Sequence, residues 1–166
     1  RDSIEIKEIF NGEYISYYEN GNIKIKEYFI ENLLDGEQFE FYESGRLFRS
    51  RVYKNGKIDT STYTIEYYEQ GSILSKYYES IESGAPFKQG RFESYHLNGT
   101  KLLNGEYSLN KKVGVWQEFY DSGTIFSETN YDDLNLDNTL KVKFYDVDGN
   151  LSIEANVKSI DIDCFN

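Results

Sequence analysis

An aromatic pair followed by a turn glycine recurs six times in this chain of 166 residues and constrains its fold more than any other feature. The turn glycines lie 24 to 28 residues apart, and in four units a second glycine precedes the turn glycine by nine residues. A period of about 20 to 50 residues is typical of repeat proteins, whose units stack on their neighbours. The pairs and their glycines are Tyr17-Tyr18 with Gly21, Phe41-Tyr42 with Gly45, Tyr67-Tyr68 with Gly71, Tyr95-His96 with Gly99, Phe119-Tyr120 with Gly123, and Phe144-Tyr145 with Gly149.

Each unit is predicted to form a strand, a tight turn and a second strand. The segment from Gly114 to Tyr120 and its equivalents are rich in β-branched and aromatic residues and show no helical spacing. Glycine suits the turn because a tight hairpin needs a positive φ. In the sixth unit, Phe144-Tyr145 lies one residue further from Gly149, which predicts a turn that is longer by one residue.

Alternation along the strands should put the two members of each pair on opposite faces of a sheet. Rings on both faces favour one elongated sheet in which like residues stack from hairpin to hairpin. The sequence therefore predicts an all-β fold, in which tandem β-hairpins of about 12 strands form one elongated, twisted, antiparallel, single-layer sheet. The first aromatic residue should share a face with Ile15, Phe39, Ile65 and Val142, and the second with Tyr14, Phe92 and Trp116.

The whole chain, residues 1–166, is predicted to be a single repeat domain. Six units occupy residues 12–157, residues 1–11 form part of a preceding unit, and residues 158–166 form a C-terminal cap. Because the chain contains no Met, Arg1 is not expected to be the translation start. No run of about 18 apolar residues is present, which predicts a soluble protein, with cytoplasmic and exported locations both open.

The chain carries 18 basic and 29 acidic residues, which gives a net charge of −11. This charge repels phosphate backbones and anionic lipid headgroups, so neither nucleic acid nor an anionic membrane is an expected partner. The single cysteine, Cys164, excludes an intrachain disulfide and a cysteine-type zinc site. Its acidic neighbours, Asp161 and Asp163, disfavour a reactive thiolate.

Few residues could carry chemistry, and each has a structural interpretation. His96, the one histidine, occupies a second-aromatic position and is predicted to be a stacking ring. The segment Asp146–Asn150 is similar to the start of a calcium loop but lacks the later ligands, so we interpret it as a turn. Asp132, Asp133 and Asp137 form an acidic segment that we expect to be solvated. A thin sheet offers no deep cleft for a pair of catalytic carboxylates, and we expect no metal and no cofactor.

The connections between hairpins should emerge along one long edge of the sheet, opposite the glycine turns. The longest, Ser80–Phe87, is predicted to be a loop and contains the one proline of the chain. Insertions between repeats are commonly located on the binding side. Neutral variation in loop length would give the same pattern.

The fifth unit, from Gly114 to Tyr131, reads Gly-Val-Trp-Gln-Glu-Phe-Tyr-Asp-Ser-Gly-Thr-Ile-Phe-Ser-Glu-Thr-Asn-Tyr. This pattern closely resembles the bacterial MORN-repeat variant, a family that includes YwqK-type antitoxins of toxin–antitoxin systems. The resemblance covers residues 12–157. It implies an array of β-hairpins that acts as a scaffold for contacts with proteins or lipids, and it supplies no catalytic residues. Lipid-binding members have a basic surface, from which this acidic chain departs.

These observations favour a non-enzymatic module that binds another protein, and the acidic surface favours a basic partner. The resemblance implies a toxin-neutralising, antitoxin-like form of that function. The alternative is an exported surface or secreted module that contacts host protein or carbohydrate, and an enzyme that cleaves carbohydrate with an Asp/Glu pair comes last. The oligomeric state is left open. The predicted contact residues are Tyr18, Tyr42, Tyr68, Phe87, Trp116, Tyr120 and Tyr145.

Overall fold

The computed structural model describes residues 8–82, 85–133 and 138–158. These residues form one antiparallel sheet of 14 strands, twelve of which follow one another across the sheet in chain order. The short strands β3 and β6 lie beside this path and pair with β2 and β5. The strands are β1 (Gly12–Tyr17), β2 (Ile23–Ile30), β3 (Leu33–Leu34), β4 (Gly36–Phe41), β5 (Leu47–Lys54), β6 (Lys57–Ile58), β7 (Thr64–Tyr67), β8 (Ile73–Glu82), β9 (Ala85–Tyr95), β10 (Lys101–Ser108), β11 (Lys111–Phe119), β12 (Ile125–Asn130), β13 (Thr139–Tyr145) and β14 (Leu151–Lys158), and a 3₁₀ turn, η1 (Tyr131–Asp133), follows β12.

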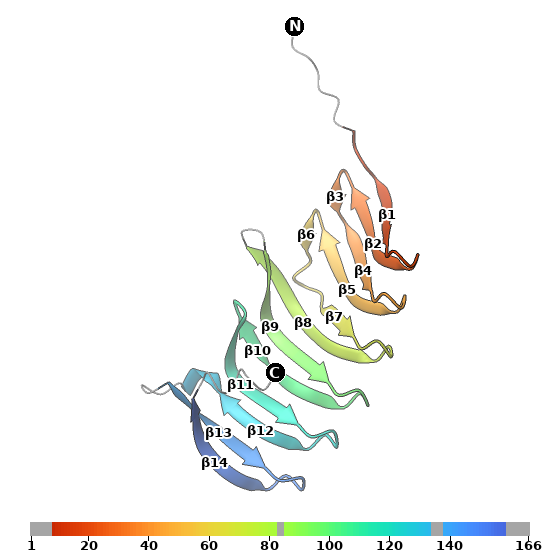
Figure 1. Cartoon of the computed structure of the whole chain (residues 1–166). Coiled ribbons are helices and arrows are strands. Elements are labelled where there is room, and N and C mark those ends of the chain that lie inside the picture. Colours follow the sequence, from red (N-terminus) through yellow and green to blue (C-terminus); the bar gives the residue numbers. More distant parts are fainter. Residues whose placement is uncertain (1–7, 83–84, 134–137, 159–166) are drawn as a thin grey trace.

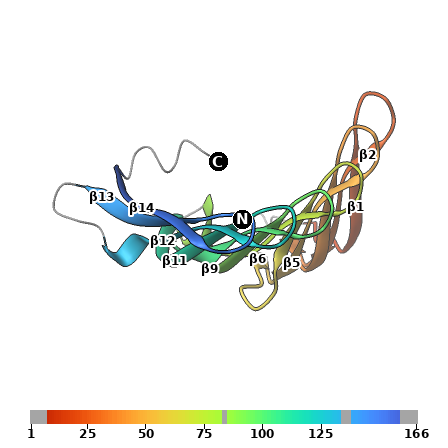
Figure 2. The same cartoon turned by 90° about the horizontal axis from the view of Figure 1, so that it is seen from below.

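The hairpins stack side by side into an elongated single layer (Figure 1). The glycine turns lie along one long edge of this layer, which we call the turn edge, and the connections between hairpins lie along the other (Figure 1). Seen from below, the layer is curved, and the strands at its two ends differ in direction (Figure 2). The predicted all-β, twisted, single-layer array of hairpins is confirmed.

All six glycine turns have the same backbone hydrogen bonds. In the first, Gly21 N donates to Tyr18 O at 3.0 Å and Tyr18 N donates to Asn22 O at 2.8 Å. The six turn glycines have φ values between +85° and +99°. An L side chain adopts this conformation only at a cost, so glycine is the residue that suits each turn.

The two faces of the sheet differ in burial. The closed face carries the residues that lie seven before each turn glycine, and five of these six are buried. The open face carries the residues that lie six before each turn glycine, and all of these are partly exposed. The closed-face set is Tyr14, Gln38, Thr64, Phe92, Trp116 and Val142, and the open-face set is Ile15, Phe39, Ile65, Glu93, Gln117 and Lys143.

In the sixth hairpin the aromatic pair is displaced by one residue. Gly149 N donates to Asp146 O, and Asp146 N donates to Asn150 O, both at 2.9 Å, as in the other turns. The sixth turn therefore has the ordinary length, and the predicted longer turn is wrong. Because the backbone bonds of the turn set the register, Tyr145 takes the first-aromatic position and lies on the open face. Val142, which was expected on that face, lies on the closed face instead.

Each hairpin contains a β-bulge beside its glycine turn. In the fifth hairpin the register shifts between Glu118 and Phe119, and the other hairpins shift at the equivalent position. The extra residue on the second strand, Phe126, then packs on the second aromatic residue, Tyr120, with ring centroids 5.1 Å apart. Bulges increase the local twist, which agrees with the curvature of the layer.

The segment Ser80–Phe87 is not the predicted loop. Strands β8 and β9 occupy its described residues, 80–82 and 85–87, and the register pairs Ser80 with Phe87 and Ile81 with Pro86. The extra length therefore lengthens one hairpin instead of forming a loop, as Figure 1 shows for β8 and β9. In the lengthened hairpin, backbone N–H and C=O groups of one strand can pair with those of the other. A loop would leave these groups unpaired.

Several predicted features lie outside the described residues. These are residues 1–7 of the predicted partial unit, Asp137 of the acidic segment, and residues 159–166 of the predicted C-terminal cap, which include Cys164. Among the residues that are described, no helix is long and apolar enough to cross a membrane.

Candidate interaction surface

The second aromatic residue of each of the first five hairpins bonds to the backbone of the next hairpin. We call these contacts the latch bonds. Because a half-buried ring places its polar atom on a carbonyl of the following unit, each latch bond joins neighbouring repeats near the turn edge. The donors and acceptors are Tyr18 Oη to Phe41 O at 2.6 Å, Tyr42 Oη to Tyr67 O at 2.7 Å, Tyr68 Oη to Tyr95 O at 2.8 Å and Tyr120 Oη to Tyr145 O at 2.9 Å, while His96 Nε2 lies 2.9 Å from Phe119 O.

Trp116 is buried at the centre of the closed face, with 4% of its surface exposed. A Cβ at Gly105 would lie 2.3 Å from the indole, so glycine makes room for the ring. The indole Nε1 donates to Glu106 O at 3.1 Å. Tyr77 and Phe92 complete the buried cluster. Trp116 therefore holds the sheet together and offers almost no surface to a partner.

Two lysines lie over the rings of this cluster. Lys88 Nζ is 4.7 Å from the ring centroid of Tyr77 and 4.9 Å from that of Phe92. Lys112 Nζ is 4.8 Å from the ring centroid of Trp116. A cation over an aromatic face contributes about 0.5–2 kcal/mol. The alkyl chains of both lysines also cover apolar surface of the cluster. In a β-sandwich, a second sheet would cover this surface.

An ion-pair network occupies the closed face between β4 and β8. Arg49 lies 3.0 Å from Glu40 and 3.6 Å from Glu66. Arg51 lies 3.2 Å from Glu40 and 3.4 Å from Glu79, and the side chains of Arg51 and Glu79 are almost fully buried. The two guanidinium groups offset most of the charge of the three carboxylates within the sheet, so this part of the face is used for structure.

An apolar stripe follows the turn edge on the open face. In each hairpin the first-aromatic position pairs across the turn with the residue two after the glycine, which is aliphatic in five of the six. No described element covers the stripe, and its outermost members are 59% and 56% exposed. We call these residues the edge stripe: Tyr17 with Ile23, Phe41 with Leu47, Tyr67 with Ile73, Tyr95 with Lys101, Phe119 with Ile125, and Tyr145 with Leu151.

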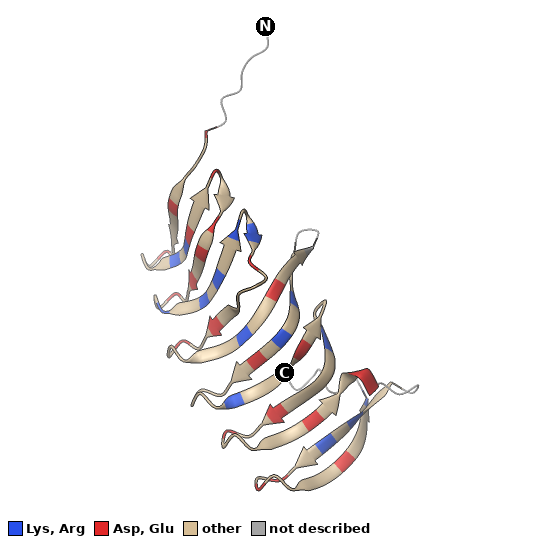
Figure 3. Cartoon of the chain, turned by 180° about the vertical axis from the view of Figure 1, so that it is seen from behind, with Lys and Arg blue, Asp and Glu red and all other residues tan. Residues whose placement is uncertain are grey.

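Exposed carboxylates border the edge stripe. An acidic residue lies two before the turn glycine in four hairpins. Figure 3 shows this acidic colour at the tips of the glycine turns, whereas both signs of charge are mixed along the strands. The turn edge is therefore apolar and negatively charged. These residues are Glu19, Glu43, Glu69 and Asp121.

The seven predicted contact residues do not form one surface. Trp116 is buried, and Tyr145 lies on the open face. The four latch tyrosines are half-buried on the closed face near the turn edge, with their hydroxyls bonded within the protein. Phe87 is half-buried on the lengthened hairpin, near the long edge opposite the turn edge.

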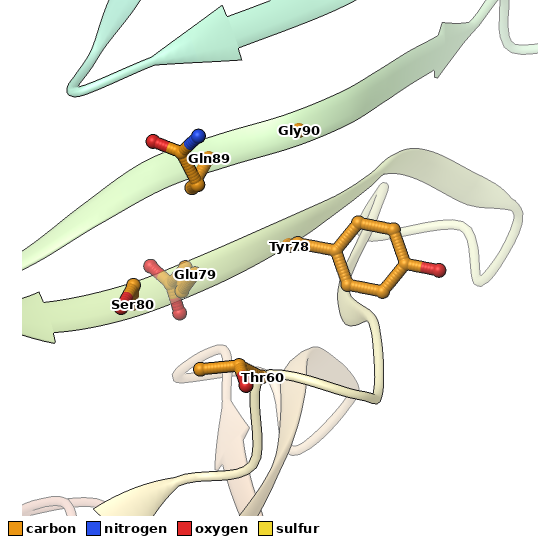
Figure 4. Close-up of a pocket in the computed structure, with 6 residues that line it drawn as sticks. All are labelled: Thr60, Tyr78, Glu79, Ser80, Gln89 and Gly90. Carbon is orange, nitrogen blue, oxygen red and sulfur yellow. The ribbon is translucent and has the colours of Figure 1, made fainter.

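A hollow of about 420 Å³ lies between β8, β9 and the segment that contains Thr60 (Figure 4). Its one carboxylate, Glu79, accepts a hydrogen bond from Thr64 Oγ1 at 2.8 Å. Gln89 Oε1 accepts from Leu109 N at 3.1 Å. Both of these side chains are bonded within the protein, and the described lining does not include the pair of carboxylates that glycoside cleavage uses.

The other candidates for chemistry have structural partners. The Asp146 carboxylate accepts hydrogen bonds from Asp148 N at 3.0 Å and Asn150 N at 2.8 Å, and these bonds lower the pKa of Asp146. Asp132 accepts from Gly114 N at 2.9 Å. Within the described part of the chain, no group of three His, Cys, Asp or Glu side chains is placed to hold a metal.

The latch bonds were not predicted, although the sequence contains a signal for them. The second-aromatic position holds tyrosine or histidine in the first five hairpins and never phenylalanine, whereas the first-aromatic position holds either tyrosine or phenylalanine. A requirement for a polar atom explains this difference. The acceptors are backbone carbonyls, which no sequence pattern can mark.

The MORN repeat variant matches three segments, residues 10–31, 34–55 and 112–133. No curated protein matches the chain. MORN repeats are commonly interaction modules for proteins or membranes. The matched segments coincide with the hairpins β1–β2, β4–β5 and β11–β12. Three hairpins of this stack are therefore similar to the MORN repeat variant.

Proposed function

We propose that this chain is a non-enzymatic module that binds a basic partner protein along its turn edge. The observation that carries the proposal is the edge stripe, a row that crosses all six hairpins, is apolar except at Lys101, and has no described element over it. On the closed face the rings are occupied with one another and with the latch bonds, so the edge stripe is the larger apolar surface left for a partner.

The composition of the edge supports a protein ligand. Aromatic side chains give large contact area at small entropic cost and are enriched among the residues that dominate binding energy. The carboxylates beside them would steer a basic partner and speed association. Of the predicted contacts, Tyr145 belongs to the edge stripe, and the half-exposed rings of Tyr18, Tyr42, Tyr68 and Tyr120 form the adjoining closed-face margin.

The test is affinity capture with the immobilised chain at moderate and high salt, followed by affinity measurements with the identified protein. The double variant Tyr67→Ser with Phe119→Ser should weaken binding at least about tenfold, because it removes two apolar anchors from the edge stripe. Tyr28→Ser is the matched control, since Tyr28 is exposed but lies away from the turn edge. Equal affinities for the two variants would refute the proposed surface.

Charge is tested separately. Glu43→Gln with Glu69→Gln should lower the association rate and its dependence on salt, with a smaller effect on dissociation. A captured protein whose association does not depend on salt would contradict a basic partner.

Toxin neutralisation is the more specific form of this proposal. It predicts that co-expression of the chain restores growth to cells that carry a toxic partner. The Tyr67→Ser and Phe119→Ser variant should fail to restore growth, while Tyr28→Ser should succeed. Rescue that is equal for both variants would show that neutralisation does not use the edge stripe.

A further inference from the structure

A groove of about 390 Å³ lies on the closed face above β12, toward the C-terminal end of the sheet. Its position differs from the edge stripe, which lies on the opposite face. The lining residues are Glu118, Phe126, Ser127, Thr129, Val142, Phe144 and Val157.

The groove results from two small side chains among large ones. The register places Ser127 between Glu118 and Phe144. In the same way, Thr129 lies between Trp116 and Val142 on the neighbouring strands. At the equivalent position of the preceding hairpin, Gly105 leaves a similar space, but the ring of Trp116 fills it. On β12, the small side chains of Ser127 and Thr129 leave a depression beside the rings of Phe126 and Phe144.

Glu118 is the distinctive group in this groove. On the same face, Glu40, Glu66 and Glu79 each have an arginine nitrogen within 3.6 Å. Glu118 forms no ion pair with the described residues, and its one hydrogen bond comes from Ser127 Oγ at 3.4 Å. Burial raises the pKa of Glu118, although Ser127, Lys112 and His96 oppose the rise. A half-buried carboxylate without a counter-ion is destabilised by its environment, and a cation in the groove would relieve this.

We propose that this groove binds a lysine side chain of the partner protein, with the ammonium group on Glu118 and the alkyl stem against Phe126, Val142 and Phe144. This inference rests on the proposed function for the existence of a basic partner. An ammonium group has three N–H donors, and Glu118, Ser127 and Thr129 provide oxygen acceptors beside an apolar channel. A guanidinium group has five donors in a planar fork and would leave some of them against apolar walls. The chemistry of the groove therefore selects lysine over arginine.

The direct test titrates the full chain with n-pentylammonium chloride and, separately, with n-pentanol, and follows the methyl signals of Val142 and Val157 by NMR. We expect saturable binding of pentylammonium that is at least about tenfold tighter than that of pentanol. Glu118→Gln should abolish this preference and leave pentanol binding unchanged. Glu128→Gln is the matched control, because Glu128 lies on the open face beside Lys143 and should leave both ligands unaffected.

Three results would overturn the inference: equal binding of the two ligands, unchanged pentylammonium binding by Glu118→Gln, or NOEs from Phe165 to Phe144, which would identify the chain's own C-terminal segment as the occupant. A chain that binds a basic protein but no pentylammonium would refute the groove alone. A chain that binds pentylammonium but no basic protein would support the chemistry of the groove and refute the proposed function.

Discussion

At the scale of single residues, the second-aromatic position combines packing with hydrogen bonding. The ring of Tyr120 packs on Phe126 with centroids 5.1 Å apart, while its hydroxyl reaches Tyr145 O in the next hairpin. His96 serves at the same position because its Nε2 lies at a similar distance, 2.9 Å, from the equivalent carbonyl. The position therefore requires a planar ring with a polar atom at its far end.

Tyr68→Phe should lower the free energy of unfolding by about 1 kcal/mol, because it removes the latch bond to Tyr95 O and keeps the ring. Urea unfolding followed by circular dichroism measures the change. Tyr17→Phe is the control, since Tyr17 is exposed and its hydroxyl makes no hydrogen bond with the described residues. An equal loss in both variants would mean that the latch bonds do not stabilise the stack.

Glu118→Gln should stabilise the protein at pH 7, and the gain should shrink as the pH falls toward the ordinary pKa of glutamate. Burial raises the pKa of Glu118, so the folded chain holds the proton more tightly than the unfolded chain and loses stability as the pH rises through the raised pKa. The amide removes the cost of the ionised form. Thermal unfolding at a series of pH values measures the difference.

Glu93→Gln is the control, for which we expect the opposite change in stability. Burial opposes the shift, but hydrogen bonds from Lys101 and Tyr95 lower the pKa of Glu93. The stability from this carboxylate is present above its unfolded pKa and is lost as the pH falls through the folded pKa. Glu93→Gln should therefore destabilise the protein at pH 7. The same sign for both variants would contradict this assignment of the two pKa shifts.

At the scale of elements, β5 joins two hairpins through its charges. Arg49 and Arg51 contact Glu40 on β4, while Glu66 on β7 and Glu79 on β8 belong to the next hairpin. In this region the closed face lacks large rings, and Gln38 and Thr64 occupy the buried positions. Ion pairs therefore take the place that the aromatic cluster has between β8 and β11.

Arg51→Ala should destabilise the protein by about 3–5 kcal/mol, because it leaves the buried Glu79 without its cation. Lys141→Ala removes the partner of Glu154 from an exposed ion pair, which water screens, and should cost much less stability than Arg51→Ala. Urea unfolding of the two variants gives the comparison. Similar losses would show that burial does not set the strength of these pairs.

At the scale of the whole molecule, each hairpin of the described sheet pairs only with its neighbours, and the hairpins follow one another in a single row (Figure 1). Stability in such a stack is a sum of unit and interface contributions. The buried aromatic cluster spans β8, β9 and β11, and β10 lies between them. The outer strand β14 is mostly exposed along its length. Stability should therefore be greatest in the middle of the sheet and fall toward its ends.

Hydrogen exchange measured by mass spectrometry should show this gradient. Amides of β9, β10 and β11 should exchange most slowly, while those of β1 and β14 should exchange fastest among the strands. A hairpin at either end of the stack loses one interface with a neighbouring hairpin when it unfolds, whereas a hairpin at the centre loses two. Uniform protection across the described strands would instead indicate a single cooperative unit.

Much of the architecture could be predicted from the sequence, since its causes are local. A turn such as that at Gly21 requires a positive φ, and strand residues alternate between faces, so the recurring pattern determined where hairpins begin and turn. The sequence predicts the wrong register for the sixth hairpin, because the aromatic pair Phe144-Tyr145 is easily recognised, whereas the backbone of Asp146 makes the hydrogen bonds of the turn. The segment Ser80–Phe87 is predicted to be a loop because its own residues do not show that β8 and β9 pair there. Strand pairing depends on the residues of the opposite strand.

The candidate site was less predictable. Sequence identified Tyr145 as a candidate but assigned it to the wrong face, and it gave Trp116 a surface role although the ring is buried over Gly105. The sequence by itself determined the repeat, the glycine turns, the all-β class and the acidic charge, because each follows from the conformational or ionic properties of residues close in the chain. Only the tertiary structure decided which face is closed, which rings are left for a partner, and where β12 leaves a groove, because burial depends on the size of side chains that register and bulges bring together from different hairpins.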